Sequence, residues 1–138
     1  MASDSENIEL TQQERVAVVM LRHDIDLEDG DEVTAVFRRA LTDVDTVATL
    51  LDLGELSFAD STLLNLILRA KAEHDQARRP FVLAVTEGGS VRRLFDITGV
   101  TDVLGLAGTR DEALRRIGTL LAADADADAA TRSAEPGS

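Results

Sequence analysis

The chain has 138 residues, a length typical of one domain with a single hydrophobic core. Its 26 acidic and 14 basic side chains give a formal net charge of −12, which disfavours direct binding to nucleic acid or to anionic membrane surfaces. Because cysteine is absent, disulfide frameworks, thiolate zinc sites and thiol catalysis are excluded. The opening MASDSENIEL has no basic segment followed by an apolar one, so we expect no export signal, no membrane insertion and a cytoplasmic location.

The first part of the chain predicts a hairpin, a helix and a central strand. We expect residues 1–5 to be disordered and two strands, NIEL and RVAVVML, to be joined by a turn at TQQE. An amphipathic helix follows, because apolar residues recur at helical spacing: Val33, Val36, Phe37, Ala40, Leu41 and Val44. The run VATLLDL, residues 47–53, is almost wholly apolar, which is typical of a strand covered on both faces and placed centrally.

A second helix and another buried strand come next. The helical stripe consists of Leu63, Leu66, Ile67 and Ala70. Pro80 forbids its continuation, and we expect His74, near the polar end of this helix, to be solvated. FVLAV then predicts a buried strand.

The last third of the core predicts two helices around a weaker strand. In EGGSVRRLFDITGV, Ser90 is expected to cap a short helix that Gly99 ends. VTDVLGL is the strand candidate. The final helix begins with Thr109 and Glu112 at capping-box spacing.

Residues 123–138 repeat Ala and Asp and carry almost no large apolar side chain, so they predict a disordered acidic tail. Residues 6–122 form the predicted domain. Strands that alternate with helices indicate an α/β fold with a mostly parallel central sheet, an N-terminal hairpin and about four helices.

Motifs for catalysis and cofactor binding are largely missing. The chain lacks GxxxxGK, GxGxxG and GxSxG, and the glycine pair of EGGS has no accompanying lysine for a phosphate. Neither His23 nor His74 has a second histidine at metal-ligand spacing, and the Asp repeat of the tail has Ala129 where a calcium loop needs glycine. We therefore expect no catalytic residue, no metal and no cofactor.

The stretch FADSTLLNL places two hydroxyls directly before a leucine-rich helix. Asp60 or Ser61 can cap that helix, which stabilises it by about 1 kcal/mol. A nucleophilic Ser61 would need a base, for which His23 is the candidate, but no oxyanion device accompanies it. The third alternative is that Ser61 accepts a group that is added later.

The run LLDLGELSFADSTLLNLILRA resembles the signature of STAS domains, the family of anti-sigma factor antagonists and sulphate-transporter cytoplasmic domains. SVRRLFDITGVTDVLGLAGTRDEAL and VAVVMLRHDID are similar to flanking elements of the family, so that the resemblance covers residues 6–122. It implies an anti-sigma factor antagonist: a regulatory switch, not an enzyme, that sequesters an anti-sigma factor with serine kinase activity and is inactivated by phosphorylation at Ser61, with Thr62 as second choice. The implied partner-binding residues are Asp24, Asp26, Asp60, Ser61, Thr62, Leu63 and Asn65.

Two departures keep an alternative open. Leu63 and Asn65 stand where the family commonly has small residues, and His23 replaces a flexible residue in the acidic turn. The alternative is an unphosphorylated STAS scaffold or small-ligand-binding domain that acts through oligomer contacts, including a homodimer.

Overall fold

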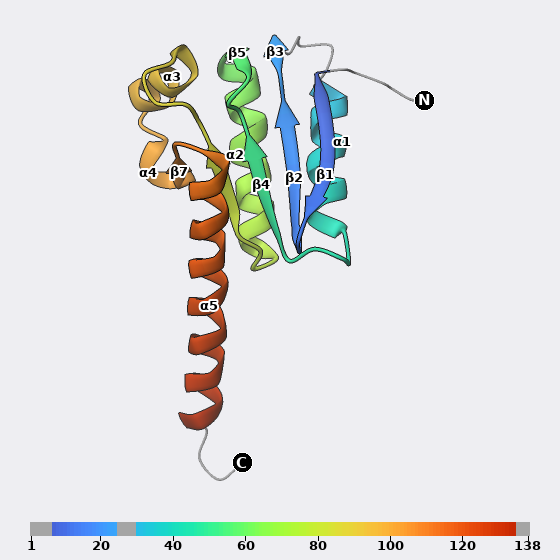
Figure 1. Cartoon of the computed structure of the whole chain (residues 1–138), viewed down its shortest axis with the longest axis vertical. Coiled ribbons are helices and arrows are strands. Elements are labelled where there is room, and N and C mark those ends of the chain that lie inside the picture. Colours follow the sequence, from blue (N-terminus) through green and yellow to red (C-terminus); the bar gives the residue numbers. More distant parts are fainter. Residues whose placement is uncertain (1–6, 25–29, 135–138) are drawn as a thin grey trace.

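The computed structural model describes residues 7–24 and 30–134, and side chains for residues 7–23 and 30–124 (Figure 1). The elements in chain order are β1 (Ile8–Gln13), β2 (Val16–Leu21), β3 (His23–Asp24), α1 (Gly30–Thr42), β4 (Ala48–Asp52), β5 (Leu56–Phe58), α2 (Ser61–Gln76), β6 (Phe81–Ala84), α3 (Ser90–Thr98), α4 (Thr101–Leu104), β7 (Leu106–Ala107) and α5 (Arg110–Ala134).

The main sheet has five strands in the order β1-β2-β4-β6-β7. β1 and β2 are antiparallel, and the other neighbours are parallel. The predicted hairpin, the mostly parallel sheet and the central position of VATLLDL, which forms β4, are therefore confirmed. A separate pair, β3 and β5, lies at one end of the molecule beside α3 (Figure 1).

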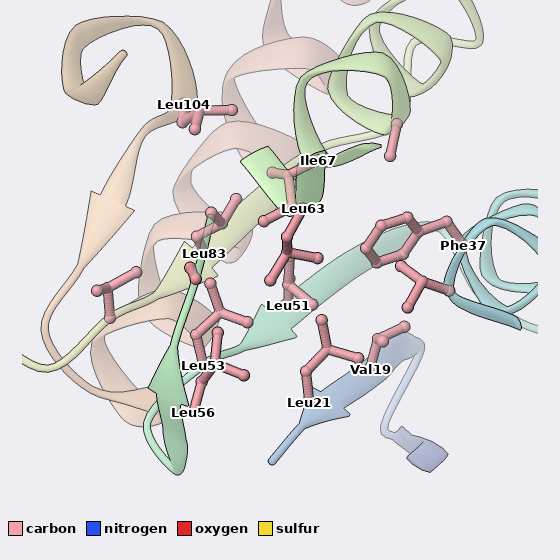
Figure 2. Close-up of a cluster of buried hydrophobic side chains, with 14 of the residues drawn as sticks. Val19, Leu21, Phe37, Leu51, Leu53, Leu56, Leu63, Ile67, Leu83 and Leu104 are labelled. Atoms are coloured by element: carbon pink, nitrogen blue, oxygen red, sulfur yellow. The ribbon is translucent and has the colours of Figure 1, made fainter. Parts of the chain in front are cut away.

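Helices cover both faces of the sheet. Alternate side chains of each central strand point to opposite faces, so the apolar side chains on each face need a covering helix. Leu51 and Leu83 face α1 and α2, where they meet Phe37, Leu63 and Ile67 (Figure 2). On the other face, a second cluster joins the strands to α5, and its buried members are Val16, Val18, Ala48, Leu50, Val82, Ala84, Ala107, Ala113 and Ile117. Because both faces are buried, the sequences of the central strands are continuous apolar runs.

Two predicted boundaries were wrong. The hairpin turn is not TQQE, because β1 continues to Gln13 and the reversal takes only the next two residues, with Glu14 at φ 57°. Val44 does not belong to the helical stripe: it is 88% exposed, since α1 ends at Thr42 and the Asp43 carbonyl accepts from the Thr46 amide in a turn. Polar residues are tolerated in β1 because it is an edge strand.

The segment after β6 also differs from expectation. Ser90 is the first residue of α3 and caps nothing, while Gly99 ends the helix in the left-handed conformation, as predicted. VTDVLGL is mainly the short helix α4, which brings the described chain to five helices, and only its last residue enters β7. The reason is that Gly105 has φ 60°, which no extended strand accommodates, and the bend lets Leu104 enter the core.

His74 is buried rather than solvated, which corrects the sequence prediction. It continues the inward face of α2 one turn beyond Ala70 and is 1% exposed. Its Nδ1 lies 2.8 Å from the Ala70 carbonyl oxygen, so Nδ1 carries the proton, and Nε2 accepts from the Thr49 hydroxyl, also at 2.8 Å. The ring contacts Phe81 at a centroid distance of 4.6 Å. Burial lowers the pKa of His74 below its usual 6.5.

Acid should therefore destabilise the fold through His74. The unfolded chain binds this proton as the pH falls below about 6.5, whereas the folded chain binds it only at lower pH, so stability is lost in that window. Urea unfolding at about pH 7.5 and about pH 5.5 measures the loss. His74→Gln should reduce the pH dependence, and an unchanged dependence in this variant would assign the effect to other groups.

The helix α5 is fixed to the sheet at its start. The Thr109 hydroxyl accepts from the Glu112 amide at 3.1 Å, as the capping-box spacing predicts, and Arg110 pairs with Asp52 at 2.9 Å. The helix then continues to Ala134 and extends well beyond the sheet (Figure 1), whereas the sequence predicts a disordered tail from residue 123. High intrinsic helix propensity of alanine accounts for the continuation. Among the described helices, none is both long and apolar enough to cross a membrane.

The independence of this tail from the domain stays a prediction. Ending the chain after Ala122 should leave the melting temperature within a few degrees, because the last buried residue of α5 is Ile117 among those whose side chains are described. Differential scanning calorimetry of both forms measures this. A larger loss would show that the tail stabilises the domain.

Candidate functional site

The candidate site is the start of α2, where Asp60 caps the helix. Asp60 has extended backbone angles, and its Oδ1 accepts from the Leu63 amide at 3.0 Å. Its carbonyl oxygen accepts from the Leu64 amide, also at 3.0 Å. Of the two capping candidates in the sequence, the structure therefore selects the carboxylate and leaves Ser61 out of the cap.

Ser61 and Thr62 present their hydroxyls to solvent. Both residues are exposed, and within the described chain neither hydroxyl has a hydrogen-bond partner. Ser61 is the first helical residue, so added negative charge there would meet the positive end of the helix dipole. Asn65 is exposed one turn further on, adjacent to Ser61 on the helix surface.

Leu63 lies inside rather than on this surface. It is 4% exposed and belongs to the core cluster under α1 and α2 (Figure 2). Its side chain therefore cannot form part of a contact surface in this conformation, which corrects its place among the expected partner-binding residues. The physical reason is helical spacing: Leu63 stands four residues before Ile67, on the buried stripe.

The β3–β5 pair places the backbone of Asp24 beside the strand that precedes α2. In its register, Asp24 lies opposite Phe58, two residues before Asp60. Asp26 lies outside the described residues. His23 is exposed with φ 58°, and in the described chain it makes no hydrogen bond to Ser61. A base and nucleophile pair is therefore not assembled.

Phe58 is a surface residue that the sequence did not single out. It is 57% exposed, although alternation with Leu56 would place it inward. β5 has only three residues, so the alternation gives too short a signal. The Ser90 hydroxyl, which caps nothing, donates to the Ser57 carbonyl at 3.2 Å and ties α3 to this strand.

The capping of α2 by Asp60 can be tested by measuring the stability of the domain, without a binding partner. Asp60→Ala should lower the free energy of unfolding by about 1 kcal/mol, because the Leu63 amide loses its acceptor. Asp60→Asn is the matched control, since asparagine caps about as well as aspartate. Urea unfolding of both variants gives the difference, and equal stability of Asp60→Ala and wild type would contradict the cap.

The family model for the STAS domain matches residues 7–113, which is most of the chain and contains the whole start of α2. The chain belongs to the STAS domain family. No curated protein matches it in sequence.

Solved structures of STAS proteins share the fold. An anti-sigma factor antagonist from Mycobacterium paratuberculosis superposes with a TM-score of 0.72 at 22% identity, covering 84% of this chain and 97% of that one. The anti-sigma factor antagonist SpoIIAA in its unphosphorylated form gives 0.67 at 21% identity, covering 81% and 96%. The Bacillus cell fate determinant SpoIIAA in the phosphorylated form gives 0.61 at 21% identity, covering 80% and 98%. At these identities the likeness establishes the fold.

Proposed function

We propose that this STAS protein is an anti-sigma factor antagonist, switched off by phosphorylation of Ser61. Its partner is an anti-sigma factor with serine kinase activity, which the unmodified protein sequesters in the cytoplasm. The observation that carries the proposal is the free, exposed hydroxyl of Ser61 beside a cap that Asp60 already supplies. Modifying Ser61 therefore costs the helix no hydrogen bond.

The physical effect of the phosphate separates folding from binding. A phosphate adds a charge of about −1.5 to −2, which the start of a helix tolerates. In a contact surface that already contains Asp60, the same charge adds repulsion and a desolvation penalty. Binding is then lost while the domain stays folded.

The proposed contact surface consists of Asp24, Asp26, Asp60, Ser61, Thr62 and Asn65. Asp60 caps α2, and Ser61, Thr62 and Asn65 lie on its first two turns. The backbone of Asp24 pairs with Phe58, two residues before Asp60. Thr62 is the second choice as phosphoacceptor, because it is the neighbouring hydroxyl and is also exposed. The protein performs no catalysis in this scheme, since the phosphate arrives from the partner.

Affinity capture from the source cell tests the proposal. Wild-type protein used as bait should retain an anti-sigma factor with a serine kinase domain, and Ser61→Asp should lose it. Thr119→Asp is the matched control, because Thr119 is exposed on α5, which covers the opposite face of the sheet. Retention of no such kinase by wild type, or equal retention by Ser61→Asp, would favour the scaffold or ligand-binding alternative.

A further inference from the structure

A cavity of about 500 Å³ lies at the β7 edge of the sheet. The end of α2, the start of β6, α4 and the middle of α5 form its walls. β7 pairs only with Leu83 and Ala84, so in the described chain Phe81 and Val82 have no strand neighbour on this side. The volume falls in the range of about 300–1,000 Å³ that is typical of small-molecule sites.

The cavity has an apolar interior, and its rim combines charged residues with two exposed apolar side chains. Phe81, Val82 and Leu104 are buried residues of its lining. Val103 and Leu120 also line it, although they are 59% and 44% exposed. Large apolar side chains left in solvent at the mouth of an apolar cavity favour a ligand with a hydrocarbon part.

Two of the four basic side chains around the cavity are already neutralised. Lys71 pairs with Asp75 at 2.7 Å. Arg116 pairs with Glu112 at 3.2 Å and also donates to the Leu106 carbonyl. These groups contribute little net charge to a ligand.

The other two, Arg78 and Arg79, have no carboxylate within ion-pair distance in the described chain. Arg79 is held in place by bonds from Nη2 to the Ala40 carbonyl and the Thr46 hydroxyl, and its Nε is buried without a partner. Burial lowers the pKa of Arg79, and the charge of Asp43, which lies beyond ion-pair distance, offsets only part of that shift.

Carboxylates at the cavity do not cancel these arginines. Asp102 and Asp124 line it and are exposed, so water screens their charge. A partly desolvated arginine attracts an anion more strongly than a hydrated carboxylate repels it.

We propose that this cavity binds a small organic anion with a hydrocarbon chain, of the medium-chain carboxylate class. The chain lies against Phe81 and Leu104, and the carboxylate meets Arg78, while Arg79 adds a second positive charge to the same lining. The site is separate from the proposed switch and does not rest on it: its first residue from α2 is Lys71, about 15 Å along the helix from Ser61.

Titration with octanoate, octanol and octylammonium tests the anion, because the three probes share one chain and differ in head group. Calorimetry and amide NMR shifts should show saturable, single-site octanoate binding at least about tenfold tighter than octanol, with octylammonium weakest. The shifted amides should include those of α4 and β6. Absence of saturable binding up to about 10 mM, or equal affinity for octanoate and octanol, would overturn the proposal.

Variants of the lining residues test whether octanoate binds in the cavity. Leu120→Asp puts a negative charge at the rim and should weaken octanoate binding at least about tenfold. Thr119→Asp puts the same charge on the neighbouring exposed residue, which does not line the cavity, and should change the affinity less than about twofold. Arg78→Gln should weaken octanoate and leave octanol unchanged. Equal effects of Leu120→Asp and Thr119→Asp would locate the binding elsewhere.

Discussion

Ser61→Asp is expected to weaken binding of the proposed partner, an anti-sigma factor with kinase activity, by about 1–3 kcal/mol, while the domain keeps its melting temperature within a few degrees. Stability is preserved because Asp60, not Ser61, supplies the cap, and because a carboxylate at the first helical position interacts favourably with the dipole. Binding is weakened because a second permanent charge joins Asp60 in the proposed contact surface.

Calorimetric titration of the captured kinase into four forms, the wild type and three variants, measures this effect. Wild type and Thr119→Asp should bind equally, because Thr119 lies on the helix that covers the other face of the sheet. Ser61→Ala should bind as wild type does, yet stay bound when ATP is added. A Ser61→Asp variant that binds as tightly as wild type would remove the support for charge as the switch.

Thr49→Val should destabilise the domain by about 1–3 kcal/mol, although the side chain keeps almost the same volume. The Thr49 hydroxyl is the donor to Nε2 of His74, and both residues are fully buried. Because Nδ1 already donates to the Ala70 carbonyl, Nε2 would be left as a buried acceptor without a donor.

Urea unfolding compares this variant with Thr49→Ser, which keeps the hydroxyl and loses one methyl group. Thr49→Ser should be the more stable of the two if the hydrogen bond dominates. The reverse order would show that packing of the methyl group, and not the bond to His74, determines stability at this position.

The parts of the fold that could be predicted from the sequence are those marked by long apolar runs and by helix-capping patterns. VATLLDL forms the central strand because a strand covered on both faces needs little besides apolar side chains. Thr109 and Glu112 mark the start of α5 because their mutual spacing is local. Gly99 ends α3 for a similarly local reason.

Features that depend on residues distant in the chain could not be predicted from the sequence. The helix sequence alone suggests that His74 is a solvated polar residue. The hydrogen bond that satisfies its Nε2 comes from Thr49, 25 positions earlier on β4, which the local pattern does not show. VTDVLGL has strand-like composition, but Gly105 bends the chain into a single helical turn. At the candidate site, the order Asp60, Ser61 and the position of Leu63 on the helical stripe were visible in the sequence. The outward Phe58 was not, because β5 is too short to give an alternation signal.

The identity of the modified residue is the most direct test of the switch. Wild-type protein is incubated with the captured kinase and ATP, and its phosphopeptides are mapped by mass spectrometry, with ATP alone as the control. We predict one phosphate on Ser61, release of the kinase, and no phosphate in the control. Phosphate on neither Ser61 nor Thr62, or autophosphorylation with ATP alone, would contradict the proposed function.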